Sequence, residues 1–201
     1  MSKILLIVIL LGVLLYYISR RIMMRTKSST DIQRSNKQGY YILDSGSKVV
    51  SKAIKATTYS VAIGVVLLII TLVLAIKIKI LFFLLPISLY LISQVFLLNN
   101  HLKYVRDQQV WFHPQTKEVV VEWLSGRQVR FNLDRDVQQI KSVQSVQKNN
   151  GVLFGYHELI LAQGSIYIPY LMEESPLNNR FFAELKTKGL EKPKTSLFPS
   201  I

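Results

Sequence analysis

The sequence contains no cysteine. This absence excludes disulfide bonds, thiolate metal sites, cysteine nucleophiles and lipoprotein anchoring. Histidine is almost as scarce: His101, His113 and His157 lie far apart, and no two of them have the spacing of metal ligands. No spacing pairs a serine nucleophile with a base either. The sequence therefore predicts a protein that is not an enzyme and that holds no metal and no cofactor.

Charge is missing from three long stretches, Ile4–Ile18, Thr58–Ile76 and Ile80–Leu98, which contain no Asp, Glu, Lys, Arg or His. A helix needs about 20 residues to cross a hydrocarbon core roughly 30 Å thick. The second and third stretches meet this length, and the first meets it when Ser19 is counted. The alternative is burial in a soluble core, but 201 residues leave too little chain to cover three such helices. We expect transmembrane helices over 1–19, 58–76 and 80–98.

The absence of ionisable groups from these stretches also bears on function. Transporters and channels keep such groups inside the bilayer because the groups carry out the transport. A small transporter or channel subunit is therefore the weaker alternative, and a membrane anchor or assembly surface is favoured. Ser93 and Gln94 are the predicted helix–helix contacts. Pro86 is expected to kink the third helix.

The first apolar run resembles a secretory signal peptide, which is one alternative. No small-x-small triplet follows it, however, and Arg20 and Arg21 come soon after its end. Such a positive cluster is the stop signal of a retained signal anchor. The segment Ser19–Thr57 carries nine Lys and Arg against two Asp, whereas one lysine precedes the first run and two separate the others. The positive-inside rule then predicts an N-terminus outside the cell and a cytoplasmic C-terminal half.

The basic loop, residues 20–57, has a second interpretation as a lipid-binding segment. Ser47–Thr57 reads SKVVSKAIKAT, which is typical of a basic amphipathic helix on a membrane surface. The simpler alternative is that its charges only set topology. The candidate contacts to anionic lipid are Arg20, Arg21, Arg25, Lys27, Lys48, Lys52 and Lys55. Beyond Asn99 the net charge is only +3, so nucleic acid is not an expected partner.

From Gln109 the hydrophobic pattern changes to a period of two, which predicts short antiparallel strands. We expect a strand at Gln109–His113, a hairpin over 119–133 around Ser125-Gly126, and a hairpin formed by Glu158–Ala162 and Ser165–Tyr170. Asp136–Gln147 fits either a helix or a twisted strand, and its composition favours a strand.

A helix is predicted after these strands. Ser175 can cap it, Pro176 fits its first position and Gly189 can end it. The apolar face of this helix is expected to consist of Leu177, Phe181, Phe182 and Leu185.

The segment 157–169, HELILAQGSIYIP, and the Phe/Leu helix after it resemble the end of the small bacterial membrane-attached domains of pleckstrin-homology-like (PH-like) fold. The resemblance covers about residues 99–190 and leaves 191–201 as a tail. It implies a PH-like antiparallel sheet or barrel closed by an amphipathic helix. Together with the three predicted transmembrane helices and the charge bias, the expectation is an α+β protein with a cytoplasmic binding domain at the bacterial inner membrane. The function expected is that of an adaptor or assembly subunit, with a protein partner or a second copy as ligand; the alternative is sensing of anionic lipid.

Overall fold

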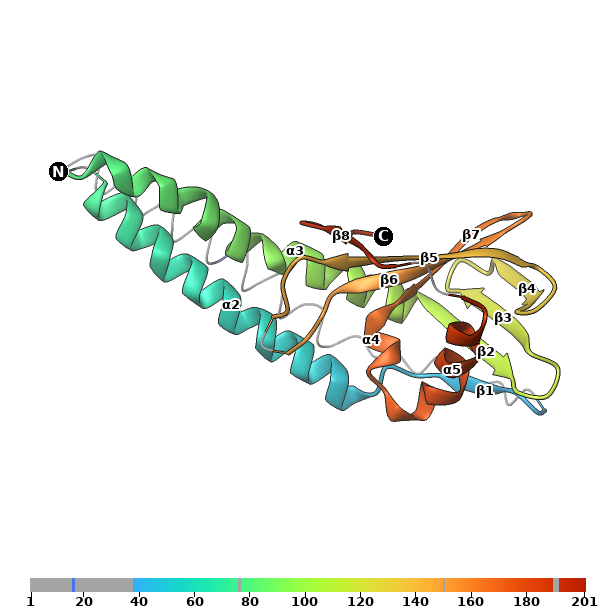
Figure 1. The fold of residues 1–201 in the computed structure, drawn as a ribbon. Helices are drawn as coiled ribbons and strands as arrows, with labels where there is room; N and C mark the ends of the chain where they lie inside the picture. The colour runs from blue at the N-terminus through green and yellow to red at the C-terminus, as the bar shows by residue number, and fades with distance from the viewer. Residues whose placement is uncertain (1–15, 17–37, 76, 150, 190–191) are drawn as a thin grey trace. The chain divides into compact units, whose positions relative to one another are not determined.

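The computed structural model describes residues 16, 38–75, 77–149, 151–189 and 192–201 (Figure 1). The chain divides into two units, Met1–Ser35 and Asn36–Ile201. In the first unit the description is limited to Tyr16, an exposed helical residue. The predicted first span and the basic residues Arg20, Arg21, Arg25 and Lys27 lie outside the described residues. All further elements belong to the second unit.

The second and third apolar runs form a helical hairpin. Helix α2 (Ser47–Leu74) is followed by the short 3-10 helix η1 (Lys79–Leu84), which leads into α3 (Leu85–Asp107). Two helices, Ser47–Leu74 and Lys79–Asp107, are long and apolar enough to cross a membrane. Pro86 stands in the first turn of α3, where a missing N–H is not needed, and not inside the helix as expected.

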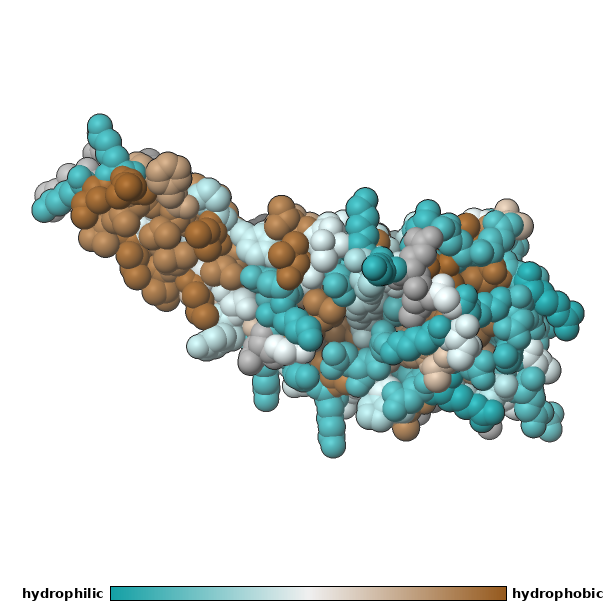
Figure 2. Space-filling model, viewed as in Figure 1, coloured by the Kyte–Doolittle hydropathy of each residue, from teal (hydrophilic) through white to brown (hydrophobic). Residues whose placement is uncertain are grey.

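The two helices approach each other closely where α2 presents small residues. A Cβ added at Gly64 would lie 2.7 Å from the Cβ of Leu91 and 3.0 Å from the carbonyl oxygen of Ser88. Ala56 and Thr57 are buried on the same helix, about two turns earlier. Large apolar side chains such as Val66 and Val73 instead remain more than half exposed. Figure 2 shows a brown, hydrophobic surface over the end of the hairpin that lies away from the sheets.

The rest of the unit contains two four-stranded sheets. Sheet A has the order β1-β2-β3-β4 and is antiparallel, with strands Tyr41–Leu43, Gln108–His113, Glu118–Trp123 and Gln128–Asn132. Sheet B has the order β7-β6-β5-β8, with strands Gly164–Pro169, Gly155–Leu161, Val137–Ser145 and Lys194–Ser196. Only β8 pairs in parallel, with β5. The sheets do not join into a barrel.

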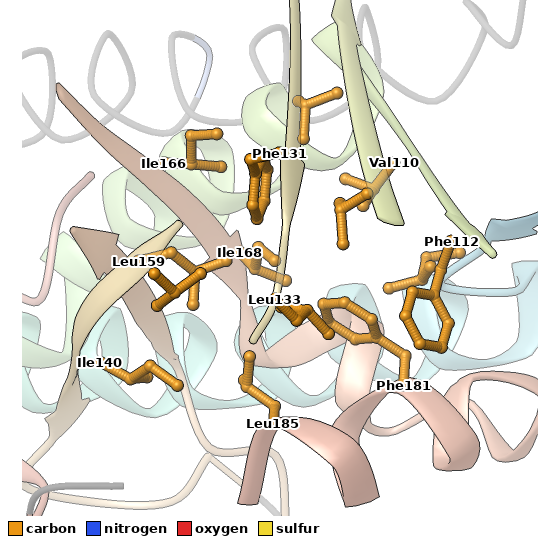
Figure 3. Packing of buried hydrophobic residues seen from close by; sticks show 14 of the residues in the cluster. Val110, Phe112, Phe131, Leu133, Ile140, Leu159, Ile166, Ile168, Phe181 and Leu185 are labelled. Carbon is orange, nitrogen blue, oxygen red and sulfur yellow. The ribbon is translucent and has the colours of Figure 1, made fainter. Parts of the chain in front are cut away.

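The main core lies between the sheets and the helix α5 (Asn179–Thr187), as Figure 3 shows. Alternate residues of each strand point into it because side chains of a strand alternate between its two faces. The ring of Phe112 from β2 meets that of Phe181 from α5 edge to face, with centroids 5.2 Å apart. Other fully buried members of this core are Val110, Val119, Val121, Leu159, Ile168 and Leu185.

A smaller apolar cluster joins the hairpin to the sheets. The connection between β5 and β6 places Val152 and Phe154 against Ala53 and Ala56 of α2 and against Leu97 and Leu98 of α3. Leu171, from the short helix α4 (Tyr170–Glu173), completes it. Lys55 of α2 directly precedes Ala56 of this cluster, so the cluster lies where the apolar hairpin ends and the sheets begin.

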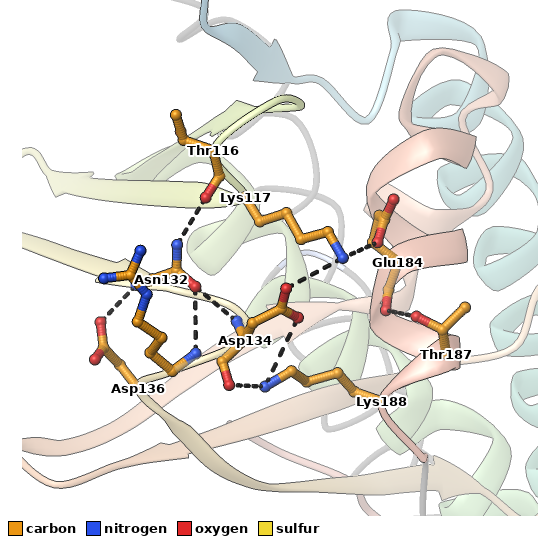
Figure 4. Close-up of polar contacts among 9 residues, drawn as sticks. Thr116, Lys117, Asn132, Asp134, Asp136, Glu184, Thr187 and Lys188 are labelled. Carbon is orange, nitrogen blue, oxygen red and sulfur yellow. Dashed lines mark hydrogen bonds and ion pairs between the residues drawn. The ribbon is translucent and has the colours of Figure 1, made fainter.

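A polar cluster fastens α5 to the turns of sheet A (Figure 4). The ammonium group of Lys117 lies 3.1 Å from both Asp134 and Glu184, the latter on α5. Asp136 accepts a hydrogen bond from the backbone N–H of Asn132 at 2.6 Å. These carboxylates therefore stabilise turns of sheet A and the attachment of α5.

Several predicted elements are confirmed and several need correction. Asp136–Gln147 is mainly the strand β5, as preferred. The last helix begins as the 3-10 helix η2 (Pro176–Asn178), and the Ser175 side chain makes no cap hydrogen bond. Leu177 is 75% exposed and does not belong to the apolar face, because a 3-10 turn aims it away from the core. Strands β1 and β8 and helix α4 were not foreseen.

Candidate functional site

An open cavity of about 570 Å³ lies beside sheet B, near the start of α2. Its walls come from β5, β6, α4, α5, the β5–β6 connection and the segment just before β8. We call it the sheet-B pocket. Its lining residues are Ser142, Lys148, Gly151, Leu153, His157, Tyr170, Glu173, Glu174, Lys186, Lys192 and Pro193.

A chain of polar side chains forms the base of the sheet-B pocket. Ser142 of β5 and His157 of β6 are directly opposite in the antiparallel register, so their side chains share one face of the sheet. The Ser142 hydroxyl oxygen lies 2.9 Å from Nδ1 of His157. Nε2 of His157 lies 3.0 Å from a carboxylate oxygen of Glu173 on α4, whose other oxygen is 2.7 Å from the Lys186 ammonium on α5.

The charge of Glu173 fixes the direction of its hydrogen bond with His157. The hydrogen bond from His157 lowers the pKa of Glu173 to about 2, and Lys186 acts in the same sense, against the opposing effect of burial. Glu173 is therefore a carboxylate at neutral pH and can only accept. Nε2 of His157 must therefore donate to it, and Nδ1 on the other side of the ring is within hydrogen-bond distance of the Ser142 hydroxyl. The Tyr170 ring, 4.6 Å from the imidazole, packs beside it.

The order serine, histidine, carboxylate is that of a hydrolase triad, so the catalytic interpretation needs testing against geometry. The sequence predicted no nucleophile–base pair, and the structure corrects this: Ser142 and His157 are within hydrogen-bond distance. Nucleophilic serines act from sharp turns that expose the hydroxyl. Ser142 instead lies inside the nine-residue strand β5 and is only 4% exposed. The arrangement is suited to holding an imidazole in one orientation at the base of a binding pocket.

The rim of the sheet-B pocket carries exposed charges. Lys148 and Lys192 are exposed, and Leu153 and Pro193 add apolar surface between them. Glu174 at the edge forms an ion pair with Lys52 of α2 at 3.7 Å. The pocket thus offers both signs of charge, an aromatic ring and apolar patches within one cavity, a combination typical of ligand pockets.

The structure brings the predicted α2 lysines together. Lys48, Lys52 and Lys55 lie on one side of the first turns of α2, beside a shallow hollow also lined by Ser47 and Ser51. All three lysines belong to α2, which begins at Ser47 and continues without a break into the apolar hairpin. Lys52 also forms an ion pair with Glu174 of the sheet-B pocket, a contact that helical spacing alone does not predict.

Ser93 and Gln94, the predicted helix–helix contacts, have other described partners. The Ser93 hydroxyl donates to the carbonyl of Tyr90 in its own helix at 2.6 Å. The side-chain oxygen of Gln94 accepts a hydrogen bond at 3.1 Å from Asn149 in the β5–β6 connection. Gln94 therefore links α3 to the connection that forms one wall of the pocket.

No protein-family model, curated protein or solved structure matches this chain. The function must accordingly be argued from the geometry of the described residues alone.

Sequence reasoning missed the sheet-B pocket for a definable reason. Its base depends on strand register, because residues 15 positions apart become neighbours only when β5 and β6 pair as they do. Glu173 and Lys186 then come from two further elements. The sequence feature that pointed to this pocket was His157, a histidine at a core-facing position of the alternating segment that forms β6. A buried imidazole needs polar partners, so His157 indicated that polar side chains lie nearby.

Proposed function

We propose that this protein is a non-enzymatic membrane protein whose hairpin anchors a cytoplasmic PH-like binding domain, and that it acts as an adaptor or assembly subunit. Two sheets closed by α5 support the PH-like assignment. The apolar outer surface of the hairpin supports the anchor. The sheet-B pocket is the feature on which the binding role depends, because its base is rigid and its rim is charged and open.

The pocket fits a segment of another protein or of a second copy. Lys148 and Lys192 can contact acidic side chains, while Leu153 and Pro193 can contact apolar ones. Glu173 and His157 are already paired with each other, so they shape the pocket and leave the rim to supply specificity. A pocket placed where the hairpin ends would receive partners that are themselves at the membrane.

Photo-crosslinking in cells tests this proposal. A photoreactive amino acid is placed at Leu153 in the pocket wall, with Leu124, which is 61% exposed in the β3–β4 turn, as the control position. We expect a discrete adduct with a protein or a second copy at position 153 and none at position 124. The adduct should weaken when Lys148→Glu is added and persist with Lys141→Glu, an exposed lysine of β5 outside the pocket. Equal crosslinking from both positions would contradict a specific partner site.

Anionic-lipid sensing is the second candidate, and the clustering of Lys48, Lys52 and Lys55 on one side of α2 favours it. Each lysine near an anionic leaflet contributes about 1 kcal/mol of attraction. We expect native mass spectrometry of the purified protein to detect bound anionic phospholipid, and the triple Lys→Gln variant at these positions to lose it. Lys103→Gln, which changes one exposed charge of α3, is the control. Retention of the lipid by the triple variant would remove this candidate.

A further inference from the structure

The segment that follows α5 ends in an apolar tip beside α3. Strand β8 pairs with β5, and the carbonyl of Ser196 accepts from the N–H of Val146 at 3.2 Å. The chain then reverses, with the N–H of Ser200 donating to the carbonyl of Phe198 at 2.8 Å. The two side chains at this reversal, Leu197 and Phe198, are 59% and 46% exposed. We call them the tail tip.

Polar contacts hold the tail tip against α3 in one place. Nε2 of His101 donates to the carbonyl of Pro199 at 2.9 Å. Asn100 exchanges two hydrogen bonds with the backbone of Ile201, at 2.8 and 3.1 Å. Three hydrogen bonds to Asn100 and His101 thus hold residues 199–201 against α3. The tail tip is therefore exposed although the chain on both sides of it is held in place.

The position of the tail tip along α3 indicates what covers it. The Phe198 ring contacts the Tyr90 ring edge to face, with centroids 5.6 Å apart. Tyr90 lies inside the uncharged run Ile80–Leu98, and its Cα is about 12 Å along the helix from the end of that run at Leu98. The polar contacts, by contrast, are made at Asn100 and His101, just beyond the run. The tail tip therefore extends toward the apolar part of the hairpin, and its anchoring points lie on the polar side.

We infer that the tail tip inserts Leu197 and Phe198 into the acyl–headgroup boundary of the bilayer, as a third contact with lipid beside α2 and α3. This inference rests on the proposed membrane location of the hairpin. Helix α3 has further exposed apolar side chains, such as Phe96 at 52%. Lys192 and Lys194, both exposed, precede the tip, and their ammonium groups can reach lipid phosphates while the apolar tip enters the acyl region.

A spin-label experiment on the full chain in proteoliposomes tests the inference, and the absence of native cysteine makes single labels straightforward. Nitroxides are attached to Leu197→Cys and, separately, to Val66→Cys in α2 and Leu124→Cys in the β3–β4 turn. Oxygen concentrates in the acyl region, whereas a polar nickel chelate stays in water. We expect the labels at positions 197 and 66 to collide more with oxygen than with the chelate. The label at position 124 should show the opposite preference.

The comparison separates two kinds of failure. A label at position 66 exposed to the chelate would show that the hairpin itself is not in the bilayer, which would remove the proposed membrane function. A label at position 66 in lipid with one at position 197 in water would overturn the tail-tip inference alone. Adding Phe198→Ser should move the label at position 197 toward water, and no change would likewise count against insertion.

Discussion

At the scale of single residues, His157 is held at both ring nitrogens, by Ser142 and by Glu173. Such a double restraint fixes the orientation of the imidazole ring. Glu173 carries the negative charge of the group and shares it with Lys186. Because three elements meet at this carboxylate, its removal affects both the sheet-B pocket and the attachment of α4 and α5 to sheet B.

Glu173→Gln is expected to lower the free energy of unfolding by about 2 kcal/mol at neutral pH. The depressed pKa of Glu173, about 2, means that its ionised form stabilises the fold. This contribution is fully present above the ordinary carboxyl pKa near 4.5 and is lost as pH falls toward 2. The figure is discounted for solvent screening because 27% of the side chain is exposed.

Thermal unfolding of the detergent-solubilised protein between pH 7 and pH 2.5 measures this effect. The unfolding midpoint of the native chain should fall over that range more steeply than that of Glu173→Gln. Glu174→Gln serves as the matched control, since its neighbouring carboxylate has only a 3.7 Å ion pair with Lys52. Parallel pH curves for the native chain and Glu173→Gln would show that the carboxylate contributes nothing.

Residue-level roles were the least predictable part of this molecule. The charge patterns that depend on sequence order, such as Lys48, Lys52 and Lys55 on one helix side, could be predicted, because helical spacing alone places them. The contacts of Gln94 could not, because its partner Asn149 lies in a connection whose path depends on the packing of Val152 and Phe154. A polar residue in an apolar run indicates a hydrogen bond but does not identify the partner.

At the scale of elements, the hairpin depends on a close approach at Gly64. Gly64→Val should destabilise the protein by about 1–3 kcal/mol, because the added Cβ would lie 2.7 Å from that of Leu91 and the helices would have to separate. Ala62→Val introduces the same side chain on the exposed side of α2 and should change stability by less than about 0.5 kcal/mol. Thermal inactivation in detergent compares the two variants. Equal midpoints for both would contradict close packing at Gly64.

The strands with strong alternation and the apolar runs were predictable because each carries its own signal. Glu118–Trp123 and Gln128–Asn132 form the expected hairpin. Strands β1 and β8 have three residues each, and β8 is the polar sequence Lys194–Ser196, so neither shows periodicity. Both exist because an edge of a longer strand is available to pair with them: β2 for β1, and β5 for β8. Short strands that form only by pairing with a longer strand depend on tertiary structure, so no hydrophobic pattern in the sequence predicts them.

At the scale of the whole molecule, the charge distribution makes a prediction about orientation. The proposed topology places the sheets in the cytoplasm and the turn between α2 and η1 on the opposite side of the membrane. Ile78→Cys, 51% exposed in that turn, should react with an impermeant maleimide added to intact cells. Leu124→Cys should react only after the cells are permeabilised. The reverse labelling pattern would contradict the charge-based topology.

Residues 193–198 connect the wall of the sheet-B pocket to the tail tip. Pro193 lines the cavity, and Phe198 rests against α3 five residues later, a separation that an extended chain spans in about 17 Å at most. Strand β8 lies between these two points and pairs with β5. We therefore expect a displacement of the tail tip to be transmitted through β8 to Pro193 at the cavity wall. A thinner bilayer should widen or narrow the entrance measurably, and pulsed-label distances from Lys192 to Lys148 that stay constant across bilayer thicknesses would refute this coupling.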